Sequence, residues 1–256
     1  MTEKENKEKN ILIVYAHPEP TSFTGILKNQ AVEFFTQQGH SVAVSDLYEM
    51  NWNAVANRTD FTKEVKGFFK LQLEQRQNTL IEEIKIEQAK VEKANLVIFI
   101  FPLWRLRLPA ILKGWFDRVF SKACSQNQKI TTPWSYQWPK LYNNGTFKEK
   151  KALLCVTTPE EKVVFSERGL FGNISKITYP LTHGCLYFCG FNILPPIYHY
   201  SINNEESQEK SLKAWGEKLE KAIDETPIEF NKLTDYGEGG LTEGKKTDFE
   251  RIGEYL

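Results

Sequence analysis

The sequence predicts an α/β protein built on an open, doubly wound, five-stranded parallel sheet with helices on both faces. Short apolar runs recur along the chain and alternate with segments of helical spacing, a rhythm that is typical of βαβ units. The runs are apolar at nearly every position, as expected of strands that are buried on both faces. Because crossovers between parallel strands are right-handed, few topologies remain.

Five apolar runs are assigned to the strands of this sheet. They lie at residues 11–16, 41–45, 95–101, 152–157 and 191–200. The last run contains Pro195-Pro196. Since proline cannot donate a hydrogen bond to a ladder, this run is expected to be an edge strand or to contain a bulge.

Helices are expected between and after these strands. Helical spacing covers residues 24–38, which stop near Gly39, residues 109–120, which Pro109 opens, and residues 205–223. The mostly polar stretch 61–92 is interpreted as further helices on the outside of the fold. We expect one domain at residues 10–225, a disordered arm at 1–9 and an irregular C-terminal tail at 226–256.

Composition excludes several classes of protein. Lys+Arg and Asp+Glu are equal at 33 each, so no overall field favours nucleic acid or an anionic membrane. No apolar stretch approaches the ~18 residues of a membrane span, and the charged N-terminus lacks the apolar region of a secretory signal. The four cysteines have no framework spacing and are expected to be reduced. These features predict a cytoplasmic protein with no nucleic-acid partner.

The topology directs attention to three loops. A common order for five parallel strands is the flavodoxin-like one, which binds its ligand at a switch point between the first and third strands. The loops at this edge are residues 17–24, 102–108 and 157–171.

The first loop reads HPEPTSFT and turns into a helix. Thr21, Ser22 and Thr24 lie beside the free N–H groups of that helix start, a setting suited to a phosphate. One of these hydroxyls is needed to cap the helix in any case. His17 at the strand end is either a pyrophosphate donor or a residue that merely satisfies the loop.

The third-strand loop carries peptide N–H groups from Leu103 to Leu106 together with the indole of Trp104. A planar heterocycle such as a flavin needs peptide groups for its rim and apolar surface for its face. The alternative is an aromatic helix cap with solvated arginines. The fourth-strand loop begins with Thr157 and Thr158, whose hydroxyls and amides are candidates for hydrogen bonds to the same ring.

Two further clusters are open to more than one interpretation. The aromatic run at 131–142 contains Trp134, Tyr136, Trp138 and Tyr142, and it fits either the wall of a substrate pocket or an oligomer interface. Cys185 and Cys189, next to His183, would share a helical face, where a metal is conceivable. Core packing is favoured for these thiols, because free cysteine behaves as a small buried hydrophobe, and no metal is predicted.

These residues, taken together, match a known family. The chain resembles the two-electron NAD(P)H:quinone reductases of animals, the group of DT-diaphorase and dihydronicotinamide-riboside quinone reductase. The shared segments are ILIVYAHPEPTSF, SDLYEMNWN, ANLVIFIFPLWRLRLPAILKGWFDRVF, CVTT, YFCGFNILPP and DETP, which extend from about residue 10 to 227. The resemblance implies a flavodoxin-like homodimer with one FAD per subunit and ping-pong hydride transfer from NAD(P)H through the flavin to a quinone.

The resemblance also assigns site residues. His17, Thr21, Ser22 and Phe23 match the first FAD-binding loop, Pro102 and Leu103 the isoalloxazine loop, and Thr157 and Thr158 the start of the last flavin loop. Trp104, Arg105 and Leu106 replace the family's Gln-Trp-Phe after Pro-Leu. Tyr136 and Trp138 fall where the family has two pocket tyrosines. His183 is the one remaining metal ligand of one branch, since Tyr187 replaces the second histidine.

Other family positions have changed in ways that bear on catalysis. Pro159 and Glu160 occupy the places of two glycines whose amides approach the flavin, and Pro159 has no N–H. Phe165 and Phe171 replace a tyrosine and a histidine that relay charge from the reduced ring, and neither can donate a hydrogen bond or titrate. Gln208 replaces an arginine on the adenine side.

The sequence therefore predicts an FAD-dependent NAD(P)H or dihydronicotinamide-riboside quinone oxidoreductase whose catalysis is weakened by these changes. Arg105, a new cation in the flavin loop, is a candidate for stabilising the anionic reduced flavin in place of the lost groups. The alternative is a catalytically impaired flavin-binding homodimer that acts through protein contacts. An FMN-dependent reductase or an ion-channel accessory subunit of the same superfamily is a third reading, which the aromatic insert and C-terminal extension disfavour.

Overall fold

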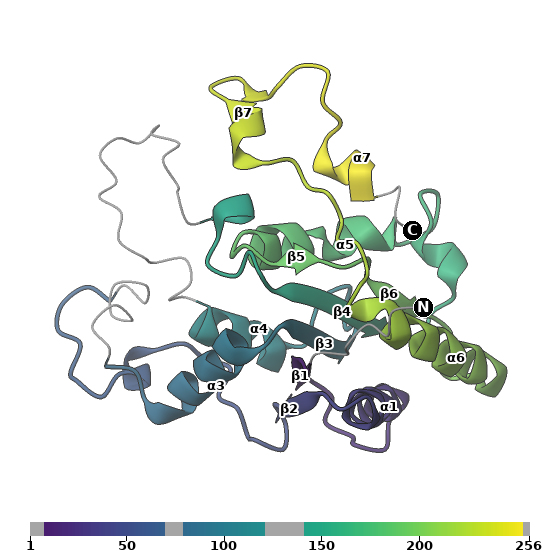
Figure 1. Ribbon diagram of the computed structural model, residues 1–256, viewed down its shortest axis with the longest axis horizontal. Coiled ribbons are helices and arrows are strands. Elements are labelled where there is room, and N and C mark those ends of the chain that lie inside the picture. Colours follow the sequence, from purple (N-terminus) through teal and green to yellow (C-terminus); the bar gives the residue numbers. More distant parts are fainter. Residues whose placement is uncertain (1–7, 70–78, 121–140, 253–256) are drawn as a thin grey trace.

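The computed structural model describes residues 8–69, 79–120 and 141–252. Its centre is a parallel sheet in the order β2-β1-β3-β4-β5, in which β6 also pairs with β4 (Figure 1). The strands are β1 (Asn10–Tyr15), β2 (Ser41–Asp46), β3 (Leu96–Pro102), β4 (Lys151–Thr157), β5 (Asn192–Ile193) and β6 (Ile197–His199). This order is the flavodoxin-like one, so the predicted fold class is confirmed.

The last predicted strand, residues 191–200, forms two short strands instead of one. β5 pairs with the start of β4 and β6 with its end, and Pro195-Pro196 lies between them. Neither proline can donate to the ladder. The interruption therefore falls where the sequence predicts it, at the edge of the sheet.

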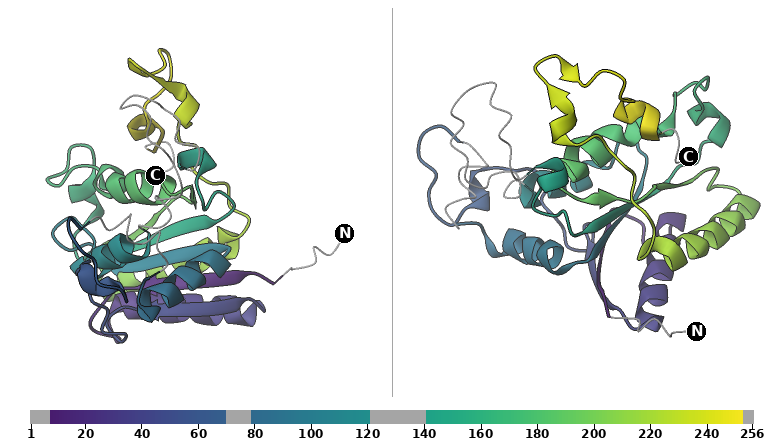
Figure 2. Two further views of the ribbon diagram at one scale, coloured as in Figure 1. Left: turned by 90° about the vertical axis from the view of Figure 1, so that its left-hand side faces the viewer. Right: turned by 45° about the horizontal axis from the view of Figure 1, so that its top comes forward.

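Helices cover both faces of the sheet. α1 (Phe23–Gln37) and α6 (Glu205–Ala222) pack on one face, against Ile11 and Ile13 of β1. α3 (Glu82–Lys93), α4 (Ala110–Val119) and α5 (Ile174–Leu181) pack on the other, against Leu12 and Val14 of β1. The alternation along β1 follows from the two-residue period of a strand. The right-hand view of Figure 2 shows the sheet between the two helical layers.

The prediction of helices throughout residues 61–92 is wrong for part of this stretch. α3 begins only at Glu82, and the described residues 61–69 and 79–81 contain no helix. A short helix η1 (Arg58–Asp60) precedes them, and Phe61 forms an antiparallel bridge with Leu80. The guanidinium of Arg58 donates to the carbonyls of Val65 (2.6 Å) and Gly67 (2.7 Å). Those carbonyls are therefore bound in a loop around Arg58.

The C-terminal residues pack beside α5 and beside the π-helical turn η5 (Thr182–Tyr187) that follows it. Their own short elements are η6 (Leu233–Asp235), β7 (Tyr236–Gly237), β8 (Gly240–Leu241) and α7 (Asp248–Ile252). Two further short helices, η3 (Tyr142–Asn144) and η4 (Lys162–Phe165), lie before and after β4. The buried Asp248 carboxylate anchors α7, because it accepts from the Asn231 N–H (2.7 Å) and lies 3.3 Å from Nε2 of His183. The segment is thus tied to the domain by a buried polar network.

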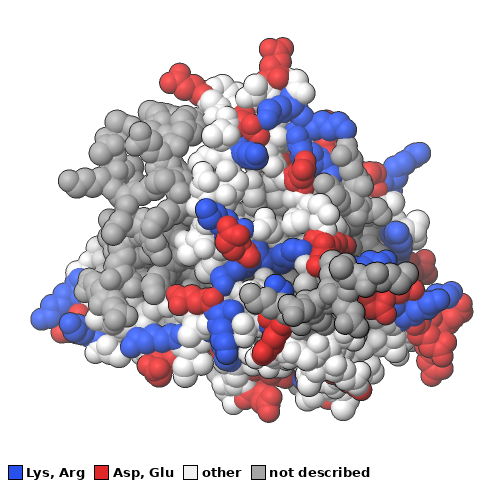
Figure 3. All heavy atoms as spheres, in the orientation of Figure 1, with Lys and Arg blue, Asp and Glu red and all other residues white. Residues whose placement is uncertain are grey.

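The distribution of charged side chains on the surface agrees with the balanced composition. Lys and Arg are interspersed with Asp and Glu over the described part of the face in Figure 3. No helix in the described ranges is long and apolar enough to cross a membrane. Cys155, Cys185 and Cys189 form no disulfide bond within the described part of the chain, which also contains no group of His, Cys, Asp and Glu arranged to hold a metal ion.

Candidate functional site

The three predicted loops meet at the carboxyl edge of the sheet. The register aligns Pro102, the last residue of β3, with Thr157, the last residue of β4. The Leu103 N–H then donates to the Thr157 carbonyl at 2.8 Å. The loops are named here by the strand that each follows: first (after β1), third (after β3) and fourth (after β4). The rings of His17 and Trp104 lie 5.9 Å apart, so the first loop contacts the third. Adjacent parallel strands end together, which brings these separate segments to one place.

The third loop is a two-residue hairpin turn. Trp104 and Arg107 exchange two main-chain hydrogen bonds, both of 2.9 Å. Between them Arg105 and Leu106 have φ angles of 51° and 58°, as a type I′ turn requires. Left-handed backbone costs a non-glycine residue roughly 1–2 kcal/mol. Strain of this kind is retained where the surrounding structure or the function demands it.

This turn decides which peptide groups are free. The sequence predicts N–H donors from Leu103 to Leu106, but those of Leu103 and Trp104 are bound within the protein. No acceptor for the N–H groups of Arg105 and Leu106 is found in the part of the chain that the structure describes. The tight turn therefore presents two adjacent donors, and it does so at the edge where the sequence places a heterocycle.

Apolar and cationic side chains flank these donors. Leu106 packs against the core cluster on the α3–α5 side of the sheet, whereas Arg105 and Arg107 are exposed. The Trp104 side chain is 41% exposed, which is unusual for an indole and leaves apolar surface beside the donors. The loop thus combines what the rim and the face of an aromatic ring require.

The first loop keeps one of its three hydroxyls at the surface. Ser22 caps α1 by accepting from the Gly25 N–H at 3.2 Å, and Thr24 is buried with its hydroxyl 2.8 Å from that of Thr157. Thr21 is exposed, and its N–H (3.1 Å) and hydroxyl (2.7 Å) both donate to the carboxylate of Glu19. These hydrogen bonds lower the pKa of Glu19. The donors that the sequence offers to a phosphate therefore hold an anionic side chain here.

His17 lies just beyond the end of β1, with its ring 5.9 Å from that of Trp104. Its Nδ1 lies 3.0 Å from the N–H nitrogen of Glu19 and 3.1 Å from the Glu19 carbonyl oxygen, so it accepts from the first in one neutral tautomer and donates to the second in the other. Burial is the main cause that lowers the pKa of His17. In the tautomer whose proton is on Nε2, that N–H is available for a ligand. Phe23, the other first-loop residue, is buried against the edge of His199 at 6.2 Å.

The fourth loop contributes fewer donors than the sequence predicts. Thr157 and Thr158 are both buried, and the Thr158 N–H donates to the carbonyl of His199 at 2.8 Å. Pro159 has no N–H, and that of Glu160 donates to the Thr158 hydroxyl at 3.3 Å. The amides at 158–160 are thus committed or absent, because β6 and the loop itself use them.

The two phenylalanines at the relay positions form an apolar wall. Phe165 is buried and its ring lies 5.4 Å from that of Phe171 and 5.8 Å from that of Tyr200. The sequence did not single out Tyr200, although it follows directly on the carboxyl end of β6, where ligand-binding residues of such sheets lie. Burial raises the pKa of Tyr200 to about 12. Its hydroxyl is therefore neutral at physiological pH.

His199 was also missed, because a histidine inside a short apolar strand resembles core. It is 2% exposed, and its Nε2 has no hydrogen-bond partner among the described residues. The ring packs edge-on between Phe23 and Trp215, both at 6.2 Å. Burial lowers the pKa of His199 to about 4.

This burial predicts a loss of stability in mild acid. An unfolded histidine binds a proton near pH 6.5, whereas His199 in the folded chain does so only near pH 4. Between these values the unfolded state binds more protons, so the free energy of unfolding falls as the pH falls. The His199 contribution lost between pH 7.5 and pH 5 is about 2 kcal/mol. Urea unfolding at pH 7.5 and at pH 5 measures this loss. The free energy of unfolding should change less between the two pH values in His199→Gln than in the wild type. Equal changes in the two proteins would contradict a lowered pKa for His199.

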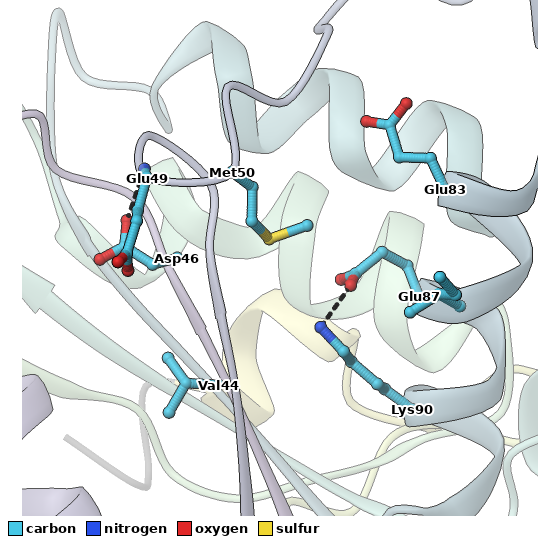
Figure 4. A pocket seen from close by; sticks show the side chains of 8 residues that line it. Val44, Asp46, Glu49, Met50, Glu83, Glu87 and Lys90 are labelled. Atoms are coloured by element: carbon cyan, nitrogen blue, oxygen red, sulfur yellow. Dashed lines mark hydrogen bonds and ion pairs between the residues drawn. The ribbon is translucent and has the colours of Figure 1, made fainter.

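Two cavities lined by described residues include none of the three loops. One of about 280 Å³ lies between β2 and α3 and is lined by Val44, Asp46, Glu49, Met50, Glu83, Ile86, Glu87 and Lys90 (Figure 4). Its innermost carboxylate, Glu87, is already paired with Lys90 (2.6 Å) and accepts from the Trp115 indole (2.8 Å). This pairing makes Glu87 a structural group. Tyr136 and Trp138, the predicted pocket residues, lie outside the described residues.

Comparison with known proteins gives the same fold and a set of relatives. The family model described as flavodoxin-like fold matches residues 9–223. The chain is 39% identical over 228 residues to the ribosyldihydronicotinamide dehydrogenase [quinone] of Pongo abelii, covering 86% of this chain and 94% of that protein. It is 38% identical over 230 residues to the NAD(P)H dehydrogenase [quinone] 1 of Cavia porcellus, covering 87% and 80%.

A solved structure extends the match to nearly the whole chain. A protein of Klebsiella pneumoniae assigned as a quinone reductase superposes with a TM-score of 0.83 at 34% identity, covering 95% of each chain. The chain therefore belongs to the flavodoxin-like family of NAD(P)H dehydrogenases (quinone).

Proposed function

We propose that this protein is an FAD-dependent oxidoreductase that takes hydride from NAD(P)H or dihydronicotinamide riboside and passes it to a quinone in two ping-pong half-reactions. The observation that carries the proposal is the strained turn at Arg105 and Leu106, which presents beside an exposed indole two N–H donors that bind no acceptor among the described residues. The relatives named above, at 38–39% identity, support the same class of reaction.

The donor set fits a flavin. A flavin ring carries several acceptor atoms along one edge and has two apolar faces, and the third loop supplies peptide donors next to apolar surface. When bound, the flavin supplies the hydride chemistry itself. The residues proposed to hold it are His17, Thr21, Ser22, Phe23, Pro102, Leu103, Trp104, Arg105, Leu106, Thr157 and Thr158.

Each loop has a distinct task in this proposal. The Nε2–H of His17 and the two donors of Thr21 bind phosphate, for which the carboxylate of Glu19 must first release Thr21. The third loop orients the ring. Thr157 and Thr158 of the fourth loop contribute their buried hydroxyls to the site. The Thr158 amide does not take part, because it is bound to the carbonyl of His199.

Catalysis is proposed to be slower than in a site with the full relay. Removing one positioned donor typically costs ~10²–10³ in rate, and a general acid or base contributes ~10²–10⁴. Phe165 and Phe171 offer neither, and Pro159 removes an amide. Positioning of donor and acceptor face to face remains. The guanidinium of Arg105 is proposed to stabilise the anionic reduced ring.

The assembly and cofactor are part of the same proposal. We propose a homodimer in which Tyr136 and Trp138 wall the quinone pocket. FAD is the proposed cofactor, because the aromatic insert and the C-terminal extension suit the larger, FAD-binding members of the superfamily. Residues 10–225 are proposed as the flavin-binding domain, with 226–256 as an appended tail. Mass spectrometry of the released cofactor distinguishes FAD from FMN.

A direct test uses the purified full-length protein. We expect yellow protein whose visible flavin absorbance bleaches under argon when NADH, NADPH or dihydronicotinamide riboside is added. Adding menadione should restore the colour. Protein that stays colourless after incubation with FAD would refute the proposal.

A second function is favoured by the fourth loop and the two phenylalanines. With its amides committed and its relay positions apolar, the site is also compatible with a flavin-binding homodimer that acts through protein contacts and no longer turns over. The same experiment separates the two. Normal flavin binding without bleaching by any of the three donors would select this second function.

A further inference from the structure

We infer that the third loop makes the acceptor pocket selective for quinones that carry an anionic group, such as a carboxylate or a sulfonate, and that Arg105 is the residue that selects them. This inference rests on the proposed function, since it concerns the acceptor of that same site. Three observations support it: the position of Arg105 in the turn, the absence of an ion pair to its guanidinium among the described residues, and the apolar surface of Trp104 beside it.

The position follows from the backbone. Arg105 and Leu106 are the two central residues of the turn, and their N–H groups are the free donors proposed for the ring. Leu106 packs inward against the core, while Arg105 is exposed. The backbone of Arg105 is therefore fixed at this edge of the sheet, next to the second ring donor, and its side chain is exposed.

The charge of this loop is not neutralised within the described residues. Neither Arg105 nor Arg107 has an ion pair there, and Arg107 donates only to the Leu106 carbonyl at 3.0 Å. Other arginines of the chain are bound: Arg118 pairs with Asp60 at 3.0 Å, and Arg58 donates to two carbonyls. Two guanidinium groups thus remain available at one hairpin.

The chemistry of the loop fits one class of acceptor. Guanidinium is planar and binds carboxylate or sulfonate oxygens through paired N–H groups. The exposed indole of Trp104 supplies a face for an aromatic ring. An acceptor that combines a planar ring with an anionic substituent uses both features, whereas a neutral quinone uses only the indole.

Steady-state kinetics with two acceptors test the inference. The ratio of kcat/KM for 1,4-naphthoquinone-2-sulfonate to that for menadione is measured in the wild-type holoenzyme and in Arg105→Gln, with one donor at saturation. A charge-assisted hydrogen bond predicts a fall of about tenfold or more in this ratio. Arg105→Lys should retain part of the preference, and raised salt should lower the wild-type ratio.

Matched controls separate the possible outcomes. Lys162 is an exposed cation of the fourth loop, in η4, and Lys162→Gln should leave the ratio unchanged. An equal fall for Lys162→Gln would overturn the role of Arg105 in favour of a general surface field. A ratio unchanged in Arg105→Gln, or a change confined to the KM for NADPH relative to dihydronicotinamide riboside, would also overturn it. Failure of the proposed function is distinct, because no donor would then reduce the wild-type flavin.

Discussion

A Gly25→Ala variant is expected to lose flavin affinity by about 100-fold, because its first loop can no longer keep its shape. Gly25 lies in the first turn of α1, directly under the loop. A Cβ atom at this position would be 2.1 Å from the carbonyl oxygen of Pro20 and 3.1 Å from the hydroxyl of Tyr15. The first contact is with backbone, which cannot rotate away as a side chain can.

The displacement would reach the groups proposed to bind phosphate. The Tyr15 hydroxyl donates to the Glu19 carbonyl at 3.3 Å, and Ser22 caps α1 through the Gly25 N–H itself. Moving residues 19–22 outward therefore shifts Thr21 and weakens the cap. Affinity is measured by quenching of flavin fluorescence on titration with apoprotein, with circular dichroism to verify that the fold is kept.

Gly216→Ala is the matched control for this substitution. Gly216 also lies within a helix, α6, but the nearest atom to its Cβ would be Nε2 of Gln30 at 3.5 Å, an ordinary contact. Alanine here should leave flavin affinity unchanged and stabilise the protein by roughly 0.5–1 kcal/mol through helix propensity. Wild-type flavin affinity in Gly25→Ala would show that the first loop does not position the cofactor.

An Arg118→Met variant is expected to lower the free energy of unfolding by about 3–5 kcal/mol, which is a large part of the stability of a typical domain. Arg118 in α4 and Asp60 in η1 are both buried, with exposed side-chain fractions of 1% and 0%. The Nε and Nη2 groups of Arg118 donate to Oδ1 of Asp60 at 3.1 and 3.0 Å, and its Nη1 donates to the Asn53 carbonyl at 2.8 Å.

The cost arises from what the substitution leaves behind. Methionine fills much of the volume, but the carboxylate of Asp60 would remain buried without its cation. The guanidinium also lies 4.4 Å from the ring of Trp52, so a cation–π contact is lost. Urea unfolding at pH 7.5 measures the change, provided that the transition stays two-state.

A double substitution and a surface control give this prediction its sharpest form. Arg118→Met combined with Asp60→Leu removes both charges and should be more stable than Arg118→Met alone. Lys210→Gln, which breaks the exposed pair of Lys210 with Glu206, should leave the unfolding midpoint unchanged. If the double variant were less stable than the single one, the buried charge of Asp60 would not be the source of the loss.

The positions of the strands could be predicted from local sequence, whereas the order of the sheet was expected from the common topology of five parallel strands and from the family resemblance. β3 and β4 are buried at nearly every position, and their apolar runs are continuous in the sequence. Pro109 precedes α4, and Pro195-Pro196 divide the edge strand. These signals act on the backbone of the residues that carry them. The stretch from 61 to 81 carried no such signal, and its predicted helices were wrong where the structure describes it.

The sequence by itself determined the strands and the loops that follow them, because apolar periodicity and proline act over a few residues, and the family resemblance indicated the order of the sheet. Tertiary structure alone decided which donors remain free there. Leu103 gives its N–H to Thr157, and Thr158 gives its N–H to His199, across strands that are 40 or more residues apart in sequence. Such pairings depend on register and packing between distant segments, so composition and spacing cannot reveal them.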